Sequence, residues 1–142
     1  MYRILGIDFG LARTGIAVSD PLGIFASPLE TVHSAKLIDY IKNYAQREPL
    51  GKIVVGYPKN LDNTASEAAS GVDEFLKRLK ADLPGLPVEL EDERFTSVLA
   101  HRAMIEGGMK YSRRRNKAEA DRISAAIILQ SYLDRSRNGR EK

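Results

Sequence analysis

Cysteine and tryptophan are both absent from this chain of 142 residues, and histidine occurs only twice. Without cysteine the chain cannot form disulfide bonds or thiolate metal sites, so a metal ion would have to bind through oxygen ligands or the two histidines. Long apolar runs are also missing. No segment is apolar for long enough to span a bilayer, and the N-terminus lacks the pattern of a signal peptide. We therefore expect a cytoplasmic location and no membrane partner.

The composition is that of an ordinary globular protein, with 43% hydrophobic and 29% charged residues. A chain of 142 residues can bury a core large enough to fold without disulfide bonds. No repeat, low-complexity tract or interdomain linker divides the sequence. We predict one domain spanning residues 1–142, with a flexible tail from about residue 136.

Positive charge is concentrated at the C-terminal end. The formal net charge is +3, but residues 109–142 carry ten Lys or Arg against four acids, which leaves the preceding residues net acidic. In KYSRRRNK, 110–117, five of eight residues are basic and none is acidic. Such a run is often an ordinary solvated loop, but its position just before the last helix favours a loop that binds phosphates. The expected contacts are Lys110, Arg113, Arg114, Arg115 and Lys117.

The apolar pattern of the first part of the chain predicts three strands and a helix. The strands, 2–9, 14–20 and 25–31, are joined by tight turns, which favours an antiparallel meander. A helix capped by Ser34 follows, with apolar residues at helical spacing from Leu37 onward.

Strands and helices alternate in the rest of the chain. The segment KIVVGYP is apolar at its centre, as parallel strands are, and Thr64 with Glu67 forms a capping-box pattern. The expected elements are a strand at 52–58, a helix from Thr64 to about Lys80, a strand at 88–95, a helix from Thr96 or Ser97 to Ile105, and a helix from Ala118 to about Arg135. The order βββαβαβαα implies an α/β protein with a mixed five-stranded sheet flanked by helices. This is the strand order of the ribonuclease-H-like fold.

Three acidic residues occupy positions from which they could converge. Asp8 interrupts an apolar strand, and Asp121 is on the last helix. The fifth strand ends at Glu93, and its neighbour Asp92 is the alternative candidate at this position. An ionised carboxylate at the end of a buried strand is costly unless it is paired, hydrogen-bonded or bound to a metal.

Each of these acids alone could be a turn, cap or surface residue. If the first and last strands lie near the sheet centre, however, both strand-end acids project from one end, and the last helix could bring Asp121 there. Three converging carboxylates favour a site for one or two Mg²⁺ or Mn²⁺ ions that promote phosphodiester hydrolysis.

Two further segments could contact a nucleic-acid backbone. Arg13 follows the first turn, where it could bind a phosphate beside the metal site or form a structural ion pair with Asp20 or Asp92. In GYPKNLDNT, Lys59 and Asn60 could contact the sugar-phosphate backbone.

Four ordered motifs make the sequence resemble a known family. They are GIDFGLARTGIAVSD, VVGYPKNLD, EDERFTS and EADRISAAIILQSYLD, and they run over nearly the whole chain. They are similar to those of the YqgF family of bacterial proteins, whose members are described as Holliday-junction-resolvase-like proteins and as pre-16S rRNA nucleases. The resemblance implies a ribonuclease-H-like fold and a divalent-metal-dependent nuclease. It assigns the catalytic and metal-binding roles to Asp8, Glu93 and Asp121.

The resemblance implies two substrates. It places maturation of the 16S rRNA precursor at its 5′ end first, with structured RNA and pre-ribosomal particles as partners. The alternative is a Holliday junction resolvase acting on branched DNA in recombination and repair, which would suggest a homodimer that cuts symmetrically. The residues themselves do not distinguish RNA from DNA, or a monomer from a homodimer.

Two readings from other classes compete with a nuclease. One is a non-catalytic nucleic-acid-binding assembly factor, but clustered carboxylates would not help a protein that only binds phosphates. The other is an ATPase, because GIDFGLARTG is similar to the phosphate-binding hairpin of the actin and sugar-kinase ATPases. Those proteins need two such domains around a nucleotide, and 142 residues cannot supply both.

Overall fold

One mixed sheet organises the part of the chain that this computed structural model describes, residues 1–59, 67–108 and 113–140. Its strands are β1 (Arg3–Asp8), β2 (Arg13–Ser19), β3 (Ala26–His33), β4 (Leu50–Tyr57) and β5 (Val88–Asp92), in the spatial order β3-β2-β1-β4-β5. β2 is antiparallel to β1 and β3, while β4 is parallel to β1 and β5. The predicted meander and the predicted mixed sheet are both confirmed.

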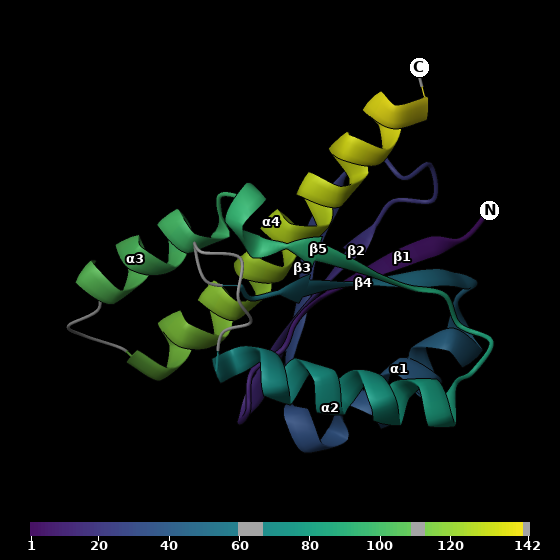
Figure 1. Ribbon diagram of the computed structural model, residues 1–142, viewed down its shortest axis with the longest axis horizontal. Coiled ribbons are helices and arrows are strands. Elements are labelled where there is room, and N and C mark those ends of the chain that lie inside the picture. Colours follow the sequence, from purple (N-terminus) through teal and green to yellow (C-terminus); the bar gives the residue numbers. More distant parts are fainter. Residues whose placement is uncertain (60–66, 109–112, 141–142) are drawn as a thin grey trace.

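Helices cover both faces of this sheet (Figure 1). α1 (Leu37–Arg47) and α2 (Glu67–Asp82) lie on one side, and the long α4 (Arg113–Arg140) crosses the other. α3 (Val98–Gly108) lies beside the N-terminal half of α4. Two 3-10 turns, η1 (Ser34–Lys36) and η2 (Glu93–Phe95), precede α1 and α3.

The two faces have separate apolar cores, because alternate residues of a strand point to opposite faces. On β1, Leu5 and Ile7 belong to the core under α1 and α2, whereas Ile4 belongs to the core under α4. The α4 core also contains Ala17, Val54, Val98, Ala125, Ile128, Leu129, Tyr132 and Leu133. Residues of α4 therefore hold the helix against the centre of the sheet.

Small residues let α4 approach the sheet backbone. A Cβ atom at Gly6 would lie 2.6 Å from the Cβ of Leu129, and one at Gly15 would lie 1.9 Å from the carbonyl oxygen of Asp121. Ala125 is fully buried at the same contact. The helix and the two central strands are thus packed closely enough to place Asp121 over β2.

Three local expectations need correction. Arg113–Lys117 was expected in a loop but forms the start of α4, because Arg and Lys favour helix and no Gly or Pro interrupts them. α4 also continues to Arg140, so the predicted tail from about residue 136 is helical to that point. Ser34 does not cap α1. Its hydroxyl instead donates to the carbonyl of Gly10 and bonds the Thr14 hydroxyl at 2.8 Å, which ties η1 to the β1–β2 turn.

The start of α3 agrees better with the sequence pattern. The backbone N–H of Val98 donates to the Thr96 hydroxyl at 3.1 Å, as expected for a residue capping α3. Thr64 lies outside the described residues. None of the helices in the described part of the chain combines the length and apolar character needed to cross a bilayer.

Candidate active site

Asp8 is the last residue of β1, and the alternation along this strand turns its side chain toward α4. Its side chain is only 13% exposed. Asp8 is paired in register with Gly15 on β2, and Gly15 touches the backbone of Asp121. The first acid is therefore held on a rigid strand beneath the last helix.

Glu93 reaches the same place from the other side of the sheet. It follows β5 as the first residue of η2, and its side chain is 5% exposed. β4 lies between β1 and β5, so the Glu93 side chain must extend over β4. A Cβ atom at Gly56 of β4 would lie 2.8 Å from Oε2 of Glu93, so the absence of a side chain at this position leaves room for the carboxylate.

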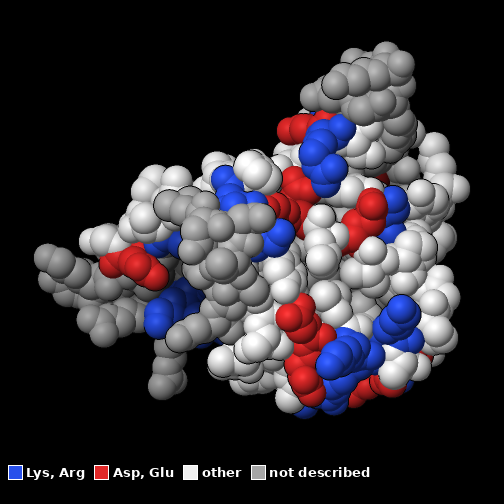
Figure 2. Space-filling view, in the orientation of Figure 1, with Lys and Arg blue, Asp and Glu red and all other residues white. Residues whose placement is uncertain are grey.

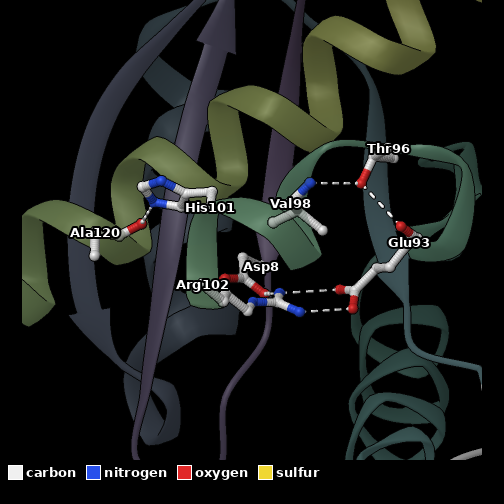
Figure 3. A network of polar contacts seen from close by, with 7 residues as sticks. All are labelled: Asp8, Glu93, Thr96, Val98, His101, Arg102 and Ala120. Atoms are coloured by element: carbon white, nitrogen blue, oxygen red, sulfur yellow. Dashed lines mark hydrogen bonds and ion pairs between the residues drawn. The ribbon is translucent and has the colours of Figure 1, made fainter. Parts of the chain in front are cut away.

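Both carboxylates bind one guanidinium group, that of Arg102 on α3 (Figure 3). Nη2 of Arg102 donates to Oδ1 of Asp8 at 2.7 Å, and Nη1 donates to Oε1 of Glu93 at 2.8 Å. A second contact joins Nη2 to Oε2 of Glu93 at 3.2 Å. The two acids thus come from non-adjacent strands and converge on a single cation.

The third acid lies nearby but binds a different cation. Nε of Arg13 donates to Oδ2 of Asp121 at 2.5 Å. Among the described residues, no group of three or more Asp, Glu or His side chains is arranged to hold a metal ion. The expected cluster of three carboxylates around one ion is therefore not formed here, because the guanidinium groups of Arg13 and Arg102 each engage part of it.

The pKa of Asp8 reflects its burial and the charged groups around it. The pKa of Asp8 is raised to about 7, chiefly by burial; the charge of Arg102 lowers it, and the negative charges of Glu93 and Asp121 raise it. The contribution of Asp121 shows that its charge acts on Asp8 even though the two carboxylates have different partners. A cation at this position favours the ionised form of the acids.

The donor set of the pair fits an oxygen-preferring divalent ion. Both side chains are carboxylates, and both already converge on one positive charge. Mg²⁺ and Mn²⁺ prefer such ligands, and Mg²⁺ typically binds one or two carboxylates and keeps several waters.

The neighbouring acid, Asp92, has a separate role. Its carboxylate accepts from the backbone N–H of Arg94 at 3.0 Å and from Nη2 of the same residue at 2.7 Å, so it caps η2. These hydrogen bonds from Arg94 hold the pKa of Asp92 below its ordinary value, with a smaller contribution from the charge of Lys59. Of the two acids at the end of β5, Glu93 is the one that meets Asp8.

Two of the basic residues proposed for nucleic-acid binding lie beside this site. Arg13 and Lys117 line a cavity of about 380 Å³ between α3 and α4, together with Arg102 and Asp121. Arg13 pairs with Asp121 rather than with the expected Asp20 or Asp92. Its partner was missed because the helix register that brings Asp121 to β2 is a tertiary feature.

The side chains of most of the remaining predicted contacts lie outside the described part of the chain. Asn60 and Lys110 lie outside the described residues, as do the side chains of Arg113, Arg114 and Arg115. On the face shown in Figure 2, basic and acidic side chains lie side by side. The ion pairs Lys52–Glu89 and Arg135–Glu91 also bring opposite charges together.

Arg102 is the residue of the site that the sequence pattern did not identify. It is four residues after the buried Val98 on the same helix, and this spacing places both on one face of α3. That was the only available signal, and it does not reveal that the face points toward two strand ends. His101, a lone histidine, bonds the carbonyl oxygen of Ala120 at 3.3 Å and helps join α3 to α4 (Figure 3).

Comparison with solved structures supports the predicted fold class. A complex of T. thermophilus RuvC with a Holliday junction substrate matches with a TM-score of 0.58, covering 98% of this chain and 97% of that chain at 20% identity. A fowlpox virus resolvase, solved with Holliday junction DNA, matches with a TM-score of 0.59 at 11% identity, covering 94% of this chain and 98% of that chain. At these identities the likeness concerns the fold, which is ribonuclease-H-like as predicted.

Sequence comparison is more specific. A protein of Bacteroides fragilis, named "Putative pre-16S rRNA nuclease", is 52% identical over 96% of this chain and 99% of its own length. One from Christiangramia forsetii with the same name is 46% identical over 94% of this chain and 98% of its own length. The family model described as "RuvX: Holliday junction resolvase" matches residues 2–135. These matches confirm the predicted enzyme class, a nuclease, and the chain belongs to the RuvX family.

Proposed function

We propose that this nuclease hydrolyses phosphodiester bonds in precursor 16S rRNA, during maturation of the 5′ end, with a divalent ion held by Asp8 and Glu93. The observation that supports the site is the convergence of these two buried carboxylates on one cation, at 2.7 and 2.8 Å. Asp121 is the third carboxylate of the proposal, since it lines the same cavity as Arg102, the residue that binds both other acids. Mg²⁺ or Mn²⁺ fits this set, as one or two ions.

The chemistry divides between the ion and the side chains. When bound, a divalent ion supplies Lewis-acid activation of water and of the phosphate. The roles of Asp8 and Glu93 are to hold that ion at the end of β1 and just after β5. Arg13 and Lys117 line the adjacent cavity and provide positive charge for a phosphate of the substrate.

The choice of RNA rests on relatives rather than on the geometry. The proteins named for pre-16S rRNA are about half identical to this chain over nearly its full length. The RuvC and fowlpox structures with Holliday junctions are at most 20% identical. Branched DNA stays the second candidate because the matching family model carries the description of a Holliday junction resolvase.

A cleavage assay on both substrates tests the proposal. The purified chain is incubated with Mg²⁺ or Mn²⁺ and either a precursor 16S RNA fragment or a four-way DNA junction. We expect cleavage of the RNA, its loss in EDTA, and its loss in the variants Asp8→Asn and Glu93→Gln. Glu74→Gln, on the exposed surface of α2, is the matched control and should cut as the unmodified chain does.

The outcomes separate the alternatives. Cleavage of the DNA junction alone would favour the resolvase. Binding of RNA without cleavage under any metal condition would favour a non-catalytic assembly factor. Undiminished cleavage in both site variants would refute the assignment of the two acids.

A further inference from the structure

Arg102 is a cation that pairs with both acids in this structure. Its guanidinium lies between two carboxylates that are 13% and 5% exposed, while its own side chain is 33% exposed. Removing water from two like charges is costly unless a cation accompanies them. The position between the acids is therefore held by a cation that belongs to the chain itself.

A divalent ion held by these acids and the Arg102 guanidinium would bind the same two carboxylates. Oδ1 of Asp8 and both carboxylate oxygens of Glu93 bond Arg102. Simultaneous binding would place an additional positive charge against the guanidinium within a buried site, which is unfavourable at low effective dielectric. We therefore expect Arg102 to release at least part of this contact when the acids ligate an ion.

The helix that carries Arg102 has little else to hold it to the sheet. Among the described side chains of α3, residues 98–107, only Val98 is buried. Leu99 and Met104 are 45% and 75% exposed. The hydrogen bond from His101 to the carbonyl of Ala120 joins α3 to α4 rather than to a strand. Elements with few buried apolar contacts open at low free-energy cost.

We infer that Arg102 is a built-in counter-ion that occupies the acid pair until a divalent ion binds, and that its release loosens α3 from the sheet. This inference rests on the proposed function, since it assumes that the acid pair holds an ion. Arg102 also lines the cavity shared with Arg13 and Lys117, so the released guanidinium remains beside the two groups proposed to bind a phosphate. Arg102 is thus a positioning residue that couples ion binding to the arrangement of α3.

The simpler interpretation is a permanent structural ion pair. In that case the guanidinium stays in place, and its removal only destabilises the protein. The two interpretations predict opposite changes in ion affinity when Arg102 is removed. A permanent partner orders the ligands, so its loss weakens ion binding, whereas a competing counter-ion lowers affinity, so its loss strengthens ion binding.

Titration calorimetry with Mg²⁺ on the metal-free chain measures this sign. Arg102→Gln removes the charge and retains a polar side chain, and we expect its affinity for Mg²⁺ to rise about ten- to a hundredfold, the equivalent of a charged hydrogen-bond pair. Arg135→Gln is the matched control, because Arg135 also pairs with a buried glutamate, Glu91, on the α4 face. The control should lose stability without gaining Mg²⁺ affinity. An unchanged or weaker affinity in Arg102→Gln overturns the inference.

Thermal unfolding provides an independent test of whether Mg²⁺ replaces Arg102 at the acid pair. In EDTA, Arg102→Gln should unfold at a lower temperature than the unmodified chain, because two buried carboxylates lose their counter-ion. Saturating Mg²⁺ should remove most of this difference. If Arg102→Gln does not fold, Arg102→Lys retains the charge but cannot bridge both acids as the planar guanidinium does, and it should show a smaller gain in Mg²⁺ affinity.

Hydrogen exchange on the unmodified chain tests the coupling to α3. Amides of Val98–Gly108 should exchange faster in Mg²⁺ than in EDTA, while those of Leu37–Arg47 in α1 should not change. Slower or unchanged exchange in α3 would overturn the coupling.

The Asp8→Asn change, made both in the unmodified chain and in the Arg102→Gln variant, separates this inference from the proposed function. If Mg²⁺ binds the unmodified chain and Arg102→Gln equally and Asp8→Asn abolishes both, only the role of Arg102 is wrong. If neither binds Mg²⁺ through Asp8, the proposed metal site itself is wrong.

Discussion

Gly15 and Asp121 touch through their backbones, although 106 positions separate them in the sequence. A Cβ atom at residue 15 would lie 1.9 Å from the carbonyl oxygen of Asp121, far inside van der Waals contact. Gly15 is also the register partner of Asp8. The contact between a strand and a helix therefore sets the distance between two of the three acids.

Replacing Gly15 with alanine should force α4 away from β2. Overpacking of a well-packed contact typically costs about 1–3 kcal/mol of unfolding free energy, and here the clashing atom belongs to the backbone and cannot rotate away. Urea denaturation of Gly15→Ala measures this loss. Gly85→Ala is the control, because a Cβ atom there meets nothing within 4 Å. Equal stability of the two variants would show that α4 adjusts freely.

Gly56→Ala should weaken ion binding more than its position on β4 suggests. The added Cβ atom would lie 2.8 Å from Oε2 of Glu93 and 2.6 Å from Cδ1 of Ile128. We expect displacement of the Glu93 carboxylate and a fall of about tenfold in Mg²⁺ affinity, as for other changes around metal ligands.

The double variant with Ile128→Val separates the two clashes at this glycine. It relieves the contact with Ile128, so stability should recover while Mg²⁺ affinity stays low. Recovery of both would place the effect in the core rather than at Glu93.

Asp8→Asn should stabilise the metal-free protein above neutral pH. The pKa of Asp8 is raised from 3.8 to about 7, so the folded state binds this proton more tightly than the unfolded state does. The free energy of unfolding of the unmodified chain therefore falls as pH rises from about 4 to 7, because ionisation of the buried group becomes increasingly costly.

The asparagine variant lacks this pH-dependent loss. It should exceed the unmodified chain by about 1 kcal/mol or more at pH 8, since one unit of pKa shift corresponds to about 1.4 kcal/mol. The two should converge near pH 4. Denaturation in EDTA at both pH values measures the difference, and a gain that does not depend on pH would point to packing instead.

The arginine run of 113–115 remains a prediction from the sequence. If these side chains bind phosphates, replacing all three with alanine should lower the slope of log affinity against log salt by about three units. The matched control replaces the exposed Lys77, Arg78 and Lys80 of α2, on the opposite face of the sheet. Nucleic-acid binding measured at several salt concentrations distinguishes the two. Equal slopes would show that charge acts only through the overall field.

The sequence by itself determined the order of strands and helices along the chain, and it singled out Asp8 as a candidate. Alternating and continuous apolar runs reflect which faces of each strand are buried, and this pattern is local, so the mixed sheet was predictable. Asp8 was conspicuous because a carboxylate in an apolar strand needs a partner. The sequence did not show whether Glu93 or Asp92 belongs to the site. Successive side chains of a strand point to opposite faces, so a shift of one residue in the strand end exchanges the two.

Tertiary structure decided the partners of those acids. Arg102 meets Asp8 and Glu93 only because α3 follows η2 at the edge of the sheet and turns one face toward the strand ends. Arg13 meets Asp121 only because Gly15 lets α4 approach β2. Periodicity shows which face of a helix is apolar but not where that face lies relative to another element. The charge balance of the site depends on that relative placement, which arises when distant segments pack together.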